Sequence, residues 1–170
     1  MKKVLLFSLL FAAISCSPAL FNVSTSKDIS SGLLTDKDVL VLGAGDAVSN
    51  GQVVDGSGQK LASKVYSNLK TRRCEAMLDN VHKSIDAVAE SELQKYDYVI
   101  VPSISYWEDN LTAWSGKPDK ITFSLEIFDK NKNKVNTATV DAKSSTVTMS
   151  ANDPADLIDK PVIEFFNKVF

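Results

Sequence analysis

YDYVIVPSISYWEDNLTAWSGKP, residues 96–118, is the stretch that decides the fold. Its first half is a nearly continuous run of β-branched and aromatic residues, which is typical of a strand buried on both faces. Its second half holds both tryptophans of the chain, two adjacent carboxylates and a Gly/Pro exit. A rigid strand that leads into such a loop is a common way to present a recognition surface.

Two further strands and two helices are expected before this stretch. Apolar runs at residues 38–43 and 72–78 indicate strands, and each is followed by a segment with helical spacing, at 57–70 and 84–95. Leu61, Val65 and Leu69 form the buried stripe of the first helix, and Ser57 is its expected N-cap. The order strand–helix–strand–helix–strand implies two right-handed crossovers and therefore a parallel core of three strands.

The pattern after Pro118 changes to that of an antiparallel hairpin. Residues 121–127 alternate between apolar and polar side chains, a polar turn follows at 129–134, and residues 135–144 return. Asp153-Pro154 then indicates a helix start, and Pro161 is expected to divide the last segment into two short helices. The chain thus predicts one mixed α/β domain over residues 37–170: a βαβαβ parallel core, an antiparallel hairpin and a C-terminal helix.

The N-terminal leader has the features of a secretory signal. Lys2 and Lys3 precede an apolar run that is too short to span a bilayer, so residues 1–15 are expected to be a signal peptide. Ala13-Ile14-Ser15-Cys16 resembles a bacterial lipobox, which implies palmitate-type acyl chains and diacylglycerol on Cys16. An ordinary cleaved signal with an incidental cysteine is the alternative. Ser17 in place of an aspartate implies sorting to the outer membrane, facing the periplasm.

Residues 16–36 are expected to be the lipidated cysteine and a flexible tether. Seven serines and threonines, a proline and a glycine lie between residues 17 and 36, and the apolar residues among them show no clear period. A flexible segment of this length has an r.m.s. span of about 25 Å, so the domain would stand off the membrane.

Several functional classes are disfavoured by composition and spacing. The formal net charge of −2 argues against nucleic-acid binding, which needs a basic surface. Gly43-x-Gly45 follows a strand, but Val48 stands where a dinucleotide fingerprint has its third glycine. His82 is the only histidine and is expected in an exposed loop, while Cys74 is expected as a small apolar filler. No catalytic, cofactor-binding or metal-ligating residue is therefore expected.

Four segments together resemble the DUF4823 family of bacterial lipoproteins over about residues 37–170. They are Tyr98–Pro102, Trp107–Asp109, Trp114–Asp119 and Asp153–Leu157. The resemblance implies a lipoprotein but no assigned biochemical activity. The order of elements is more loosely similar to envelope-assembly modules, namely the N-terminal domain of TolB, the periplasmic part of CsgG, and LpoB.

These observations favour a non-catalytic, membrane-anchored binding or assembly module of the cell envelope. The candidate binding surface consists of Tyr106, Trp107, Glu108, Asp109 and Trp114, because Trp and Tyr are enriched at binding hot spots. Its partner would be an envelope protein whose identity the sequence does not specify. The alternative for the two tryptophans is that they only cover the sheet edge.

Two other functions stay open. An enzyme is disfavoured because Glu108 and Asp109 are adjacent, so on a strand they would point to opposite faces. A carrier of a small ligand or lipid would need an enclosed apolar cavity.

Overall fold

The computed structural model describes residues 19–28, 31–72, 74–110, 117–145 and 153–170. The expected leader, Cys16 and Trp114 lie outside these residues. The strands are β1 (Leu20–Thr25), β2 (Asp38–Leu42), β3 (Ala47–Ser49), β4 (Gln52–Val54), β5 (Glu75–Asp79), β6 (Tyr98–Glu108), β7 (Lys120–Asp129) and β8 (Lys134–Lys143). The helices are α1 (Ser57–Thr71), α2 (Glu90–Leu93), α3 (Asp159–Val169) and the 3-10 turns η1 (Ile85–Ala87) and η2 (Pro154–Leu157).

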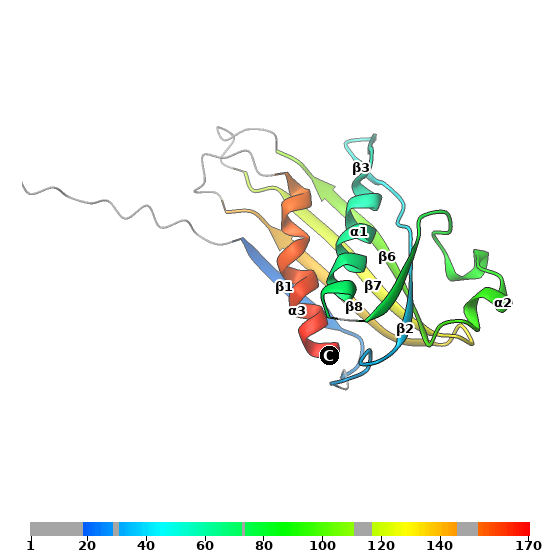
Figure 1. The fold of residues 1–170 in the computed structure, drawn as a ribbon. Helices are drawn as coiled ribbons and strands as arrows, with labels where there is room; N and C mark the ends of the chain where they lie inside the picture. Colours follow the sequence, from blue (N-terminus) through cyan, green and yellow to red (C-terminus); the bar gives the residue numbers. More distant parts are fainter. Residues whose placement is uncertain (1–18, 29–30, 73, 111–116, 146–152) are drawn as a thin grey trace, which may run out of the picture.

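Six strands form one mixed sheet in the order β1-β8-β7-β6-β2-β5 (Figure 1). β5, β2 and β6 are parallel, whereas β6, β7, β8 and β1 are successively antiparallel. The predicted single-domain mixed α/β fold, with its parallel core, hairpin and C-terminal helix, is therefore confirmed. β3 and β4 form a separate two-stranded hairpin.

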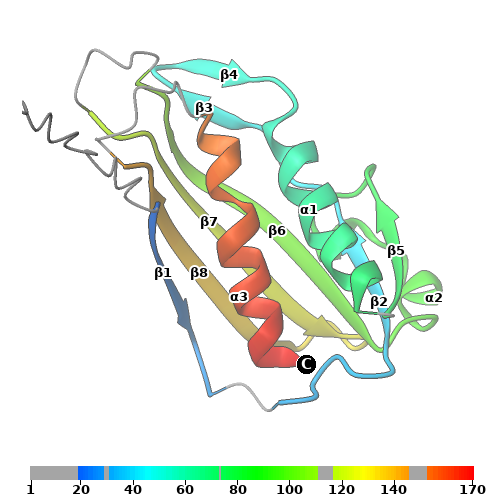
Figure 2. The same ribbon diagram turned by 60° about the vertical axis from the view of Figure 1, so that its left-hand side comes forward.

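One face of the sheet, called the inner face here, is covered by α1 and α3 (Figure 2). The predicted stripe of α1 is fully buried there. α3 contributes side chains at helical spacing, and β7 contributes every second residue. Fully buried members of this layer include Phe123, Leu125, Ile127, Val162, Phe165, Phe166 and Val169. None of the described helices is long and apolar enough to cross a membrane.

The opposite face, called the outer face, is covered only in part. The segment with η1 and α2 packs over β2 and the first half of β6 through Ile85, Val88 and Leu93. The predicted continuous helix at 84–95 is wrong, because Val88 and Ala89 are extended and separate η1 from α2. Val88 is buried against the sheet, and the extended link lets its side chain reach it.

The predicted flexible tether is wrong for residues 20–25, which form the edge strand β1. This strand pairs antiparallel with β8 from Leu20 opposite Lys143 to Thr25 opposite Ala138. Phe21 and Val23 point to the inner face and pack against the core, while Leu20, Asn22 and Ser24 point outward. This alternation is typical of a strand with one face exposed to solvent. It spans only a few residues among serines and threonines, so the sequence pattern alone does not indicate a strand here.

Candidate functional site

A shallow hollow of about 540 Å³ lies at one end of the outer face. It crosses the four antiparallel strands where β1 and β7 begin and where β6 and β8 end. The residues that line it are Leu20, Phe21, Asn22, Tyr106, Lys120, Ile121, Thr122, Asp141, Ala142 and Lys143. The helices α1 and α3 cover the other face of the sheet (Figure 2), and Tyr106 in the hollow is exposed.

Tyr106 of the expected binding surface lines this hollow, and Glu108 is hydrogen-bonded to it. The Tyr106 hydroxyl donates to Glu108 Oε2 at 2.8 Å, and Lys120 Nζ lies 2.9 Å from the same oxygen. The hydrogen bonds from Lys120 and then Tyr106 lower the pKa of Glu108 to about 2. The hydrogen bond to Glu108 also raises the pKa of Tyr106. Tyr106 remains 47% exposed, so its ring is available for contact.

Trp107, in contrast, is a core residue, which corrects the expectation that it belongs to an exposed surface. It is 4% exposed and lies opposite Ile121 on the inner face. The register of β6 against β7 shifts between Ile104 and Tyr106, so that Ser105 is an extra residue in β6. Such a bulge reverses which side chains face inward beyond it. It therefore places Trp107 inside and Tyr106 outside.

Asp109, another member of the expected surface, is not among the residues that line the hollow. Asp109 follows the end of β6 and is half-buried, whereas Trp114 lies outside the described residues. The structure thus brings together Tyr106 and Glu108 and adds Lys120, which sequence reasoning missed. The role of Lys120 follows only from the register between β6 and β7, which places Glu108 opposite Lys120. A sequence without known register does not reveal such a pair.

The β3–β4 hairpin lies at the same end of the molecule, beside β6 (Figures 1 and 2). Asn50 and Gly51 form its turn with φ of 51° and 79°, the left-handed geometry that a two-residue hairpin needs. Val48 and Val53 lie opposite each other and are 60% and 61% exposed. Asn50-Gly51 between two short apolar runs is a typical hairpin signal.

The loop after β2 packs against the start of α1. The N-cap is Gly56 rather than the expected Ser57, whose hydroxyl accepts from the Ala47 N–H at 2.8 Å. The carboxylate of Asp46 accepts from the Gly58 N–H at 2.9 Å. A helix N-terminus can bind phosphate through backbone N–H groups that have no acceptor within the helix. In α1 one of these groups, the Gly58 N–H, already donates to Asp46 and is not available to a phosphate.

His82 is paired rather than simply solvated. Its Nδ1 lies 2.6 Å from Asp79 Oδ2, and the backbone N–H groups of Val81 and His82 donate to Asp79 Oδ1. The pKa of Asp79 is lowered because these hydrogen bonds together outweigh its desolvation. Within the part of the chain that the structure describes, no group of three or more potential ligands could hold a metal ion.

β5 is an edge strand of the sheet beside β2, and no described strand pairs with its outer side. Met77 on this strand is 57% exposed, and Val81 just beyond it is 81% exposed. Open edges with exposed apolar side chains can pair with another chain, and monomeric proteins commonly block them with lysine or proline.

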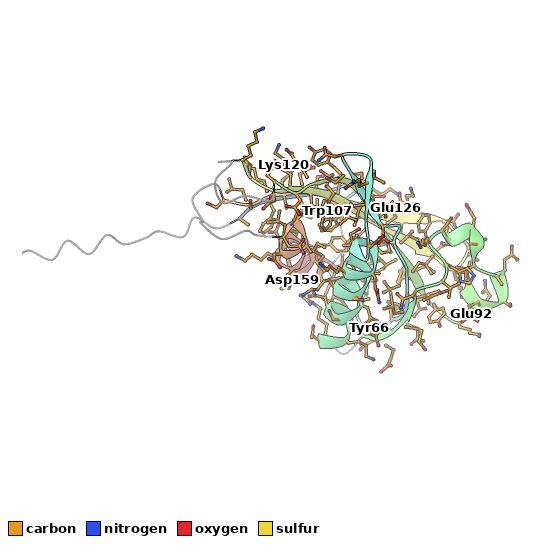
Figure 3. All side chains as sticks on the ribbon, turned by 90° about the horizontal axis from the view of Figure 1, so that it is seen from above. Tyr66, Glu92, Trp107, Lys120, Glu126 and Asp159 are labelled. Atoms are coloured by element: carbon orange, nitrogen blue, oxygen red, sulfur yellow. The ribbon has the colours of Figure 1, made fainter. Side chains whose placement is uncertain are left out.

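Figure 3 places Lys120 and Trp107 toward one end of the molecule and Glu92 of α2 toward the other. The Tyr106 hollow and the β3–β4 hairpin both lie toward the end of the sheet where β1 starts (Figures 1 and 2). This end is called the β1 end here. The turn between β7 and β8 lies at the opposite end, where Gln94 contacts Lys130.

Solved structures show the same fold. The chain is similar to a variant of PelC from Paraburkholderia phytofirmans, described as a dodecamer, with 11% identity and a TM-score of 0.64 over 86% of this chain and 97% of that chain. A second PelC dodecamer structure from the same organism matches with 12% identity and a TM-score of 0.62 over 88% of this chain and 98% of that chain. Comparison with curated proteins gives no significant match.

A family model described as a domain of unknown function matches residues 33–169. This range includes every helix and strand of the described domain except β1. The chain therefore belongs to the DUF4823 family.

Proposed function

We propose that this chain is a non-catalytic module of the bacterial cell envelope, which a lipid on Cys16 anchors to the membrane and which assembles there with further copies of itself. The observation that carries assembly is the open β5 edge, with Met77 exposed beside unpaired backbone. PelC shares the fold and is dodecameric, which supports self-association as the mode of assembly.

The electrostatics of the Tyr106 hollow support binding rather than acid–base catalysis. A general acid or base works best with a pKa near the working pH. Lys120 and Tyr106 instead hold the pKa of Glu108 at about 2, and the pKa of Tyr106 is raised above its ordinary value. At neutral pH the carboxylate thus stays ionised and the phenol stays protonated. Both groups therefore keep one protonation state, in which the Tyr106 hydroxyl donates a hydrogen bond to the Glu108 carboxylate.

The shape of the hollow supports a surface module over a carrier. A carrier encloses most of its ligand in an apolar cavity. The hollow beside Tyr106 is open and includes charged side chains, and the inner face of the sheet is filled by fully buried residues such as Phe123 and Phe165.

Self-assembly can be tested in cells that express two copies of the chain with different C-terminal tags. We expect each tag to co-purify the other from detergent-extracted membranes, whereas extracts mixed after lysis give no such pairing. Met77→Lys should abolish co-purification, because a lysine on an edge strand blocks strand addition. Ile163→Lys on α3 is the matched control, since Ile163 is also an exposed apolar residue, at 44%. Failure of the wild-type chain to co-purify would refute self-assembly.

The anchor is tested separately. Palmitate labelling should mark the wild-type chain and should be lost in Cys16→Ser, which should also leave the membrane fraction. An unlabelled wild-type chain would refute the lipid anchor.

A further inference from the structure

We infer that the β1 end of the domain lies against the phospholipid headgroups, with Leu20, Val48, Val53 and Tyr106 in contact with the bilayer surface. The inference rests on the lipid anchor at Cys16 in the proposed function and names what covers the Tyr106 hollow. Three independent observations lead to it: the length of the anchor segment, the distribution of exposed apolar residues, and the position of two lysines.

The anchor segment is short because β1 begins early. Leu20 lies four positions after Cys16 and is already hydrogen-bonded into the sheet opposite Lys143. Four residues span at most about 14 Å when fully extended. Because the lipid on Cys16 sits in the bilayer, the start of β1 is held close to the headgroups. The domain therefore cannot stand off by the distance that a tether through residue 36 would allow.

The end held close to the bilayer is also where exposed apolar side chains gather. Among the described residues, seven large apolar or aromatic side chains are strongly exposed, and four of them belong to this end. Leu20 is 58% exposed and Tyr106 is 47% exposed at the hollow. Val48 and Val53 form an exposed cross-strand pair on the neighbouring hairpin (Figures 1 and 2). A tyrosine is suited to the membrane–water boundary, and aliphatic side chains can insert among the headgroups.

Two lysines supply the polar part of the surface. Lys120 and Lys143 lie directly opposite each other on β7 and β8, a like-charge arrangement that is unfavourable across strands. Glu108 neutralises Lys120, but no carboxylate of the described ranges forms an ion pair with Lys143. Asp141, which also lines the hollow, accepts from Thr122 Oγ1 at 2.8 Å. Phospholipid phosphates would give Lys143 an anionic partner, and lysine side chains can extend along an apolar surface to reach them.

The test uses the full lipidated chain in vesicles of phosphatidylethanolamine and phosphatidylglycerol. Single cysteines at Val53→Cys and Lys143→Cys carry an environment-sensitive fluorophore, and Lys130→Cys in the β7–β8 turn is the control at the far end. The native Cys74 is buried and burial raises its pKa to about 11, so it should not take the label. We expect brominated phospholipids to quench the labels at 53 and 143 several-fold more than the label at 130.

The outcomes separate the orientation from the anchor. A chain that floats with the vesicles but shows equal quenching at all three positions overturns the orientation alone. A chain that does not float with the vesicles overturns the anchor, and the orientation falls with it. Labels at 53 and 143 that are unquenched in vesicles but shielded from aqueous reagents in native membranes would show a protein in place of lipid, which also overturns the inference.

Discussion

Trp107 lies directly opposite Ile121 in the register of β6 and β7, and both side chains are buried on the inner face of the sheet. The neighbouring Tyr106 lies opposite Thr122 and faces solvent. Two adjacent aromatic residues therefore have different roles: Trp107 completes the core, and Tyr106 lines the hollow on the outer face. The bulge at Ser105 causes this division.

The first prediction compares the contributions of Trp107 and Tyr106 to stability. Trp107→Ala should destabilise the domain by about 3–5 kcal/mol, because it removes a large buried side chain and leaves a cavity. Tyr106→Ala should cost much less, about 0.5 kcal/mol, since the residue is about half exposed and lies outside the core. Urea denaturation followed by circular dichroism measures both. Similar losses in the two variants would show that the bulge does not set the faces as described.

A second prediction concerns the contact between the loop after β2 and α1. A Cβ on Gly58 would lie 2.3 Å from the carbonyl oxygen of Ala44 and 2.7 Å from that of Gly45, so backbone would have to move. Gly58→Ala should therefore cost about 1–3 kcal/mol. Gly45→Ala is the matched control, because its Cβ would meet no atom within 4 Å. Thermal unfolding should show a clearly lower Tm for the first variant only.

The pH dependence of stability provides a third prediction. Because folding lowers the pKa of Glu108 from 4.5 to about 2, the carboxylate stabilises the fold above its unfolded pKa. This stabilisation is lost as the pH falls from about 4.5 to about 2. Glu108→Gln should therefore lose less stability than the wild-type chain across this window, as measured by urea midpoints at each pH. Parallel curves for the two chains would contradict the hydrogen-bonded state of Glu108. The difference should be small, since the Lys120 side chain is about half exposed.

The sequence was most informative where hydrophobic periodicity is long and local. The stripe of α1 and the alternation in β7 predicted buried residues correctly, and the order of elements predicted the parallel core. β1 was missed because its apolar residues Phe21 and Val23 are few and its pairing with β8 joins segments more than a hundred residues apart. Such long-range pairing decides whether a weak alternation becomes a strand.

The candidate site was predicted only in part, for a related reason. Tyr106 is exposed and Glu108 is half-buried beside it, while their role in binding stays a prediction. The burial of Trp107 depends on a single extra residue in β6. A one-residue shift changes the face of every later side chain, and nothing in the strand's composition marks the bulge. Lys120 joins Glu108 only through the β6–β7 register, so its role could not be derived from spacing along the chain.

The last prediction tests the length of the anchor segment directly. A flexible Gly/Ser insert of about 20 residues between Pro18 and Ala19 adds an r.m.s. reach of about 25 Å, compared with at most about 14 Å from Cys16 to Leu20. The longer tether lowers the effective concentration of the β1 end at the bilayer, so docking of this end should weaken although the lipid anchor is intact. In vesicles with brominated phospholipids, quenching of the label at position 53 should fall toward that at position 130, while flotation of the chain is unchanged. An insert of equal length after Phe170 is the control, because it leaves the anchor segment unaltered. Unchanged quenching at position 53 with the N-terminal insert would show that the short tether is not what orients the domain, and that the exposed apolar side chains suffice.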